Sequence, residues 1–135
     1  MPLHSETSVV KFNTKENTIL VGWSLSNRGS IFDAKLVLDT GASLTIISWS
    51  VANILNLNPS VAKNTVEFYS ASGKIEAPLI KIDELRVQNS VVKDFEIIVH
   101  DLPHAAGVYG LLGLNFLRNF NVNLDFKKGI ITLSR

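Results

Sequence analysis

The most informative segment of the chain is Lys35-Leu-Val-Leu-Asp39-Thr-Gly-Ala-Ser-Leu-Thr-Ile-Ile47. It places one carboxylate, that of Asp39, between two apolar runs, where burying a charge is costly unless hydrogen-bond donors meet it. Thr40, Gly41 and Ala42 can turn the chain so that backbone N–H groups face this carboxylate, and Gly41 has no side chain to block another backbone. An aspartate that merely opens a turn is the alternative, but the apolar residues on both sides favour a built site.

A second segment, Tyr109-Gly-Leu-Leu-Gly113, repeats this arrangement near the C-terminus. Each segment combines an apolar strand with a glycine-containing elbow, and each precedes a short predicted helix. The first helix runs from about Trp49 to Leu55, with Ser48 as its candidate N-cap. The second runs from about Leu114 to Asn119. The pattern indicates a faint internal duplication of strand, elbow and helix.

Short apolar runs separated by polar turns predict strands along the rest of the chain. These strands are Thr18–Leu25, Phe32–Leu38, Val66–Ser70, Lys74–Leu79, Glu84–Gln88, Asp94–Val99, Asn121–Phe126 and Gly129–Leu133. An Asn27–Ser30 turn joins the first two strands, and a three-residue Lys127–Gly129 loop joins the last two. Many short strands at close spacing in 135 residues predict one all-β domain, a barrel or a sandwich.

Composition excludes several classes of protein. A hydrophobic fraction of 46% and a charged fraction of 19% are typical of a globular domain, and a net charge of +1 creates no field that would gather nucleic acid or anionic lipid. The absence of cysteine excludes disulfides, thiolate metal sites and cysteine nucleophiles. Because Met1 to Glu6 do not form a signal peptide and no apolar run is long enough to cross a bilayer, we expect a cytoplasmic protein. An anchor upstream of this sequence would leave no trace in it.

The two segments together resemble the signatures of a known family. Asp39-Thr-Gly-Ala42, preceded by Leu36-Val-Leu38, resembles the catalytic signature of retropepsin-like aspartic peptidases, and Leu111-Leu-Gly-Leu-Asn-Phe-Leu117 resembles their second signature. The resemblance implies a retropepsin-like acid-protease barrel over residues 18–135, with one or two short helices, that acts as a C2 homodimer. Residues 1–17 are then an N-terminal extension. Retroviral members build the dimer sheet from both termini, but the C-terminal hairpin departs from their pattern, so the dimer geometry stays open.

The resemblance also implies catalytic roles for Asp39, Thr40 and Gly41. Two Asp39 carboxylates, one from each subunit, would share a proton and activate a water molecule that hydrolyses a peptide bond. Thr40 would brace the dimer by hydrogen-bonding across the two-fold axis. A homodimer is required because the chain has a single Asp-Thr-Gly triplet. The aspartates that lack a following Thr/Ser-Gly are Asp33, Asp83, Asp94, Asp101 and Asp125.

Substrate-binding residues are expected on both signatures and on a flap between them. Gly73 is the only glycine between Gly41 and Gly107, and it suits the tip of a mobile hairpin that closes over a peptide. An ordinary hairpin turn would explain it equally well. The expected substrate-binding residues are Ala42, Ser72, Gly73, Lys74, Leu111, Leu112 and Gly113. The side chains expected to line an apolar groove are Val37, Ile47, Leu79 and Leu111.

The same residues are compatible with functions other than peptide hydrolysis. The main alternative is a catalytically silent peptide-binding or dimerisation module on the same fold. The intact triplet favours the enzyme, because a binding module has no need of a facing pair of carboxylates. A third possibility is an unrelated β-barrel whose motifs match by chance. No cofactor and no metal are expected: Pro103 interrupts the candidate ligands His100, Asp101 and His104, and the chain has neither a Gly-x-Ser-x-Gly elbow nor a phosphate-binding loop.

Overall fold

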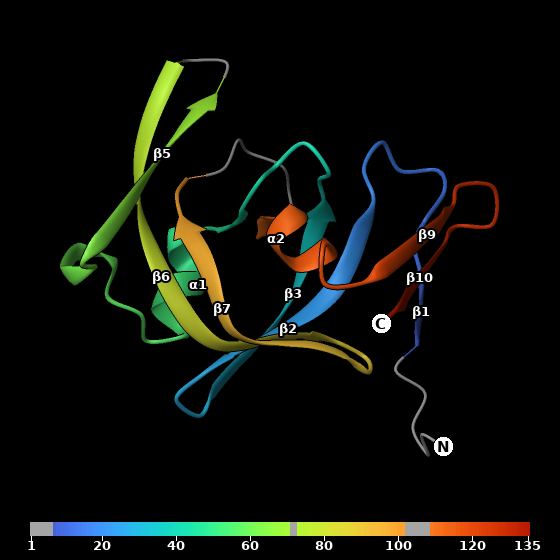
Figure 1. Cartoon of the computed structure of the whole chain (residues 1–135), viewed down its shortest axis with the longest axis horizontal. Helices are drawn as coiled ribbons and strands as arrows, with labels where there is room; N and C mark the ends of the chain where they lie inside the picture. The colour runs from blue at the N-terminus through green and yellow to red at the C-terminus, as the bar shows by residue number, and fades with distance from the viewer. Residues whose placement is uncertain (1–6, 71–72, 102–108) are drawn as a thin grey trace.

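The computed structural model describes residues 7–70, 73–101 and 109–135, which are mostly β-strands (Figure 1). The strands are β1 (Ser8–Lys11), β2 (Leu20–Asn27), β3 (Ser30–Leu38), β4 (Thr45–Ile47), β5 (Asn64–Ser70), β6 (Gly73–Val87), β7 (Ser90–Val99), β8 (Gly110–Leu112), β9 (Asn121–Asp125) and β10 (Ile130–Ser134). The helices are α1 (Trp49–Ile54), the 3-10 helix η1 (Pro59–Val61) and α2 (Leu114–Leu117). Within the described ranges, no helix is long and apolar enough to span a membrane.

Six of the strands close into a barrel. Their order around it is β2, β3, β8, β4, β7 and β6, and β6 returns to β2 with Leu85 opposite Leu25. β3 runs parallel to β8 and β4 runs parallel to β7, whereas β4 and β8 are antiparallel. β5 is an edge strand that pairs with β6. This arrangement confirms the predicted all-β barrel with short helices.

The two ends of the chain meet in a separate three-stranded sheet with the order β1, β10, β9. Side chains tie this sheet to the turn of the β6–β7 hairpin. The Gln88 amide accepts from the Val9 N–H at 3.0 Å and donates to the Val9 carbonyl at 2.6 Å. The buried hydroxyls of Ser8 and Ser90 lie 2.7 Å apart. The N-terminal strand is therefore fixed to the barrel of its own chain.

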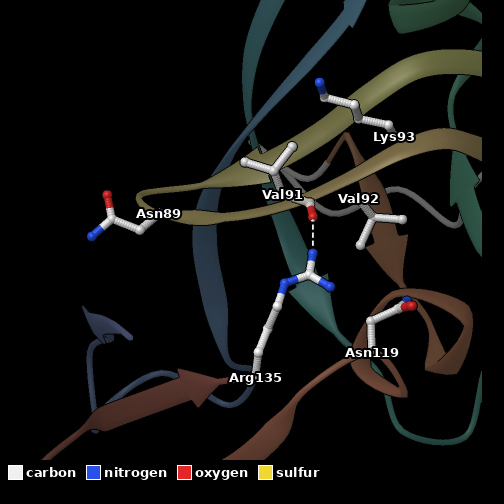
Figure 2. Close-up of a pocket in the computed structure, with 6 residues that line it drawn as sticks. All are labelled: Asn89, Val91, Val92, Lys93, Asn119 and Arg135. Atoms are coloured by element: carbon white, nitrogen blue, oxygen red, sulfur yellow. Dashed lines mark hydrogen bonds between the residues drawn. The ribbon is translucent and has the colours of Figure 1, made fainter. Parts of the chain in front are cut away.

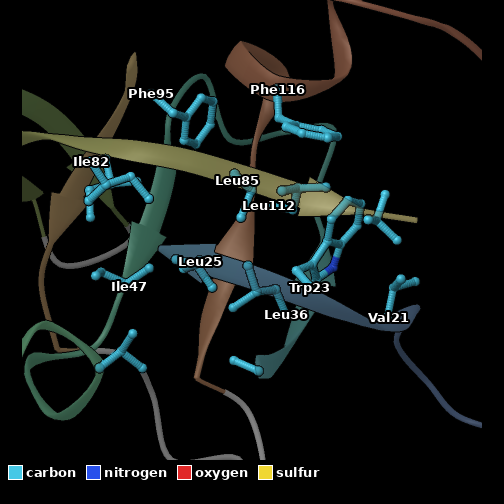
Figure 3. Close-up of a cluster of buried hydrophobic side chains, with 14 of the residues drawn as sticks. Val21, Trp23, Leu25, Leu36, Ile47, Ile82, Leu85, Phe95, Leu112 and Phe116 are labelled. Carbon is cyan, nitrogen blue, oxygen red and sulfur yellow. The ribbon is translucent and has the colours of Figure 1, made fainter. Parts of the chain in front are cut away.

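The core fills the barrel because alternate residues of each strand point inward. On β3, Ala34 and Leu36 are buried and Lys35 between them is exposed. From α2, the fully buried Phe116 packs its ring edge-on against Trp23, with centroids 5.2 Å apart (Figure 3). The core thus anchors α2, which forms the C-terminal part of the second signature.

Some predicted boundaries are confirmed and others were wrong. The Asn27–Ser30 turn is confirmed, and Arg28 and Gly29 adopt the positive φ values, 48° and 85°, that a two-residue hairpin loop requires. The predicted strands Lys74–Leu79 and Glu84–Gln88 are instead the single strand β6. It stays continuous because β7 pairs with it from Leu79 to Val87, across the gap between its pairing with β5 and its pairing with β2.

The C-terminal hairpin also differs from the prediction. Its loop comprises residues 126–129 rather than three residues, because Asp125 pairs with Ile130. The strands β1 and β4 were not predicted, and β8 was predicted only as the apolar strand of the Tyr109–Gly113 segment. Each has only three or four residues, too few for an alternating pattern to emerge. β1 lies within residues 1–17, which the sequence assigned to an N-terminal extension.

Candidate active site

Asp39 directly follows β3, at the end of the barrel where the second signature also lies. Its N–H donates to the carbonyl of Leu112 at 2.9 Å, which extends the parallel pairing of β3 with β8. The chain then turns, with the Ala42 N–H donating to the Asp39 carbonyl at 3.2 Å. The Gly41 N–H donates to the carboxylate oxygen Oδ1 at 2.9 Å. The half-buried carboxylate is therefore held by the turn that follows it, as the sequence predicted.

The second signature packs directly against this turn. The N–H of Leu114 donates to the carbonyl of Ala42 at 2.8 Å, and that of Asn115 donates to the carbonyl of Ser43 at 3.1 Å. Gly113 fits between them only because it lacks a side chain, since a Cβ there would lie 2.6 Å from the carbonyl carbon and oxygen of Leu44. The two signatures, more than seventy positions apart in the sequence, form one interlocked unit.

A partly buried set of polar contacts, the polar bridge, strengthens this unit. The hydroxyl of Thr45, which is fully buried, accepts from the Gly113 N–H at 3.0 Å. The Asn115 side-chain oxygen accepts from both the N–H and the hydroxyl of Thr45 at 2.9 Å, and its NH₂ donates to the Glu96 carbonyl at 2.8 Å. Asn115 therefore ties α2 to β4 and β7. No local sequence pattern indicated this role, because the partners lie 19 and 70 residues away.

We expect Asn115→Ala to lower the free energy of unfolding by about 2 kcal/mol, because it leaves buried donors and an acceptor unpaired. Chemical denaturation with an unchanged m-value would measure this loss. Asn53→Ala is the matched control, because Asn53 is exposed on α1 and we expect a change within about 0.5 kcal/mol. Equal stability of the two variants would contradict a structural role for the bridge.

Comparison with known proteins identifies the family. The family described as gag-polyprotein putative aspartyl protease matches residues 31–119, about two thirds of the chain. The chain belongs to this retropepsin-like family. A similar solved structure is the crystal structure of a retropepsin-like aspartic protease from Rickettsia conorii, with a TM-score of 0.71 and 22% identity over 94% of this chain and 89% of that chain. At this identity the likeness shows the fold. No curated protein sequence matches the chain.

The retropepsin-like chain has a second apolar cluster beside the two signatures, apart from the main core. Its buried members are Ile46, Ala77 and Ile98, and its partly buried members are Leu44, Val66, Phe68, Leu79 and Leu111. The cluster joins the base of the β5–β6 hairpin to residues adjoining both signatures. It therefore offers partly exposed apolar surface that includes Leu111 of the second signature.

Two of the four side chains predicted to line an apolar groove belong to this cluster. Leu79 and Leu111 lie in it, and the half-buried Val37 pairs with Leu111 across β3 and β8. The prediction that Ile47 lines the groove was wrong. Ile47 is fully buried in the main core, on the opposite face of β4 from Ile46. The members that were not predicted are Leu44, Val66 and Phe68. The alternation of Val66 and Phe68 along β5 was the signal that could have found the last two.

The remaining predicted site residues are placed around the turn. Thr40 and Gly41 are exposed, and Ala42 is half-buried. The Leu112 side chain has no exposed surface, so any substrate contact there would have to come from its backbone. Ser72 lies outside the described residues.

Gly73 and Lys74 lie at the tip of the β5–β6 hairpin, which projects from the barrel (Figure 1). Gly73 has a φ of 113°, a backbone conformation that favours glycine. Lys74 Nζ forms an exposed ion pair with Glu67 at 3.1 Å, a kind of contact that contributes at most about 1 kcal/mol. That this hairpin covers a substrate stays a prediction.

A surface groove of about 560 Å³ lies elsewhere, between the β6–β7 hairpin and the end of α2 (Figure 2). Its lining residues are Asn89, Val91, Val92, Lys93, Asn119 and Arg135. The Arg135 guanidinium donates to the Val91 carbonyl and lies over the Phe120 ring, 4.9 Å from its centroid. None of the predicted site residues lines this groove, so it is distinct from the Asp39 site.

The described part of the chain contains no group of side chains suited to bind a metal ion. No three His, Cys, Asp or Glu side chains there are arranged to hold an ion. His100 instead packs edge-on against Phe68, with ring centroids 5.6 Å apart. Its suggested companion His104 lies outside the described residues.

Proposed function

We propose that this chain is an aspartic endopeptidase whose active form is a C2 homodimer. Asp39 of each subunit supplies one of two facing carboxylates, and the substrate is a peptide or an unfolded segment of protein. Residues 18–135 form the peptidase domain. The single observation that carries the proposal is the arrangement of Asp39, a half-buried carboxylate fixed between two interlocked family signatures.

The proposed reaction is general acid–base hydrolysis. When two carboxylates lie this close to each other, they share one proton, because both cannot readily be charged at once. The ionised Asp39 removes a proton from a water molecule, whose oxygen attacks the carbonyl carbon of the peptide. The protonated Asp39 gives its proton to the carbonyl oxygen. Collapse of the tetrahedral intermediate breaks the C–N bond as the nitrogen takes up a proton, leaving a carboxyl and an amino group.

The geometry supports this assignment of roles. The Gly41 N–H donates only to Oδ1 of Asp39, and within the described residues Oδ2 makes no hydrogen bond. One carboxylate oxygen is therefore available for water and for the second carboxylate. The exposed Thr40 beside it is available for the proposed hydrogen bond across the two-fold axis. In the proposed complex, the partly buried side chains of the second apolar cluster would contact hydrophobic residues around the cleaved bond.

The test is cleavage of a diverse peptide library from about pH 4 to pH 7, beside the Asp39→Asn variant. Cuts made by the wild type and lost in the variant establish an aspartic peptidase and give its specificity. If neither protein cuts at concentrations where the dimer forms, the proposal fails. Peptide binding without cleavage would then indicate the silent binding module.

We also predict that Ala42→Ser extends activity to lower pH. Many bilobal aspartic peptidases carry serine after Asp-Thr-Gly, where the hydroxyl donates to the carboxylate and stabilises its charged form. Without that donor the carboxylate pair ionises at higher pH, so the wild type should have the less acidic optimum. Rate profiles of the two proteins from pH 3 to pH 8 would measure the shift. A profile of the wild type that peaks only at strongly acid pH would contradict this explanation.

A further inference from the structure

Two loops lie side by side at one end of the sheet formed by β1, β10 and β9 (Figure 1). The Phe12 N–H donates to the Gly129 carbonyl at 2.9 Å, which joins the loop after β1 to the loop between β9 and β10. A Cβ on Gly129 would lie 2.5 Å from the Phe12 carbonyl oxygen and 2.7 Å from Thr14 Cγ2, so the two loops are closely packed. Segments more than one hundred positions apart in the sequence thus form one surface, the loop tip, which comprises residues 11–16 and 125–129.

The loop tip concentrates positive charge. Its exposed lysines are Lys11, Lys15, Lys127 and Lys128. Within the described residues none of these lysines takes part in an ion pair. The acids of the tip are Glu16 and Asp125, and the Asp125 carboxylate accepts from the backbone N–H of Lys128 at 2.9 Å. Four lysines against two acids leave the tip with a charge of +2, which the net charge of +1 for the whole chain conceals.

An exposed aromatic side chain lies next to two of these lysines. Phe126 is 64% exposed, and Lys127 and Lys128 follow it directly. The turn that carries all three is fixed, because the Gly129 N–H donates to the Asp125 carbonyl at 2.9 Å and Gly129 adopts a φ of 68°. A phenylalanine left in water gives up the stabilisation that burial of its ring would provide. The loop tip therefore combines cationic side chains with an apolar ring that has room for a partner.

We propose that the loop tip binds the surface of a membrane that contains anionic phospholipids. The lysine ammonium groups would contact the lipid phosphates and carboxylates, and each lysine near such a surface strengthens binding roughly fivefold. Phe126 would enter the boundary between headgroups and acyl chains, where apolar side chains of peripheral proteins are buried. The site is separate from Asp39, so this inference goes beyond the proposed function and does not depend on it.

The shape and composition of the tip favour a lipid surface over nucleic acid. Proteins that bind single-stranded nucleic acid do so in grooves, where several aromatic rings stack on successive bases. The loop tip instead projects from the end of the sheet (Figure 1), and its second aromatic residue, Phe12, is half-buried. One exposed ring flanked by lysines suits a fluid surface that the ring can enter.

Co-sedimentation with lipid vesicles tests the proposal. We expect the protein to bind phosphatidylcholine vesicles that contain about 30% phosphatidylserine at least tenfold more tightly than vesicles of phosphatidylcholine alone. Binding should weaken as the NaCl concentration rises from about 50 mM to about 500 mM, because salt screens exposed charges. Equal binding to the two kinds of vesicle, or binding to neither, would overturn the proposal.

Substitutions in the tip locate the contact. Changing Lys127→Gln and Lys128→Gln together should weaken vesicle binding about 20-fold, since two of the four ammonium groups are lost. Phe126→Ala should weaken it about fivefold, because the apolar ring no longer enters the lipid. These side chains are exposed, so the fold should be retained in both variants.

The matched controls remove the same groups from other exposed positions. Lys63→Gln with Lys81→Gln removes two charges outside the tip, and Ile31→Ala truncates an apolar side chain that is 66% exposed. Both should bind vesicles within about twofold of the wild type. If these controls weaken binding as much as the tip variants, general charge or surface hydrophobicity is responsible and the proposal fails.

Two further measurements separate the alternatives. Retention of a single-stranded oligonucleotide without retention of anionic vesicles would assign the tip to nucleic acid and overturn the proposal. Asp39→Asn should bind vesicles as the wild type does, because Asp39 is not part of the tip. Vesicle binding therefore supports the inference whether or not the protein cleaves peptides, and loss of vesicle binding in Asp39→Asn alone would contradict a separate site.

Discussion

Asp39→Asn should lower the rate of peptide cleavage by at least about 10³-fold, because neither a general base nor a shared proton remains at the site. The substitution is nearly isosteric, and an amide oxygen can still accept from the Gly41 N–H. The fold and the dimer should therefore survive, so the loss can be assigned to the chemistry. Initial rates on one identified peptide, measured with equal concentrations of the two proteins, give the ratio.

Asp33→Asn is the matched control for this change. Asp33 is exposed and lies on β3, the strand that leads to Asp39, six residues before it. The same loss of one carboxylate there should leave the rate within about a factor of two, as is usual for surface positions. An equal loss in both variants would show that net charge or stability, rather than Asp39, controls the rate.

Mixing experiments test whether two chains share the site. Adding an equal amount of Asp39→Asn protein to a fixed amount of wild type should lower the activity to about half, because random pairing leaves a quarter of all dimers with two Asp39 carboxylates. A site contained in one chain would keep full activity. Retained activity at concentrations where the subunits exchange would therefore contradict the shared carboxylate pair.

The sequence predicted most strands because they obey simple local rules. β2 and β3 alternate apolar and polar residues over part of their length, β7 ends in an apolar run, and Gly29 of the Asn27–Ser30 turn suits its positive φ of 85°. The predicted N-cap of the first helix is confirmed, since the Ser48 hydroxyl accepts from the Val51 N–H at 3.4 Å. These features depend on neighbours within a few residues.

What the sequence could not provide depends on distant partners. β4 and β8 are three residues long, and they are strands only because each is held between two others in the barrel. Asn115 resembles any polar residue of a short helix until β4 and β7 lie beside it. The polar positions that hold the signatures together were therefore missed, whereas the apolar and glycine positions of the signatures were visible.

Glycine at position 113 is needed for space rather than for an unusual backbone angle. Its φ of −100° is available to any residue. A Cβ there would nevertheless lie 2.6 Å from the backbone of Leu44 and 2.8 Å from the carbonyl oxygen of Ala42. These neighbours are main-chain atoms of the turn that carries Asp39, so they cannot move aside as a flexible side chain could.

We therefore expect Gly113→Ala to lower the free energy of unfolding by about 3 kcal/mol and the melting temperature by roughly 10 °C. It should also reduce peptide cleavage in the folded protein, because the displaced turn moves Asp39 away from its partner carboxylate. Gly22→Ala on β2 is the matched control, since a Cβ at Gly22 meets no atom within 4 Å. That change should leave the stability equal or raise it by about 0.5 kcal/mol, because alanine loses less conformational entropy in a strand. Calorimetry of both variants measures the difference, and a Gly113→Ala protein as stable and as active as Gly22→Ala would show that the two signatures are not locked together at this contact.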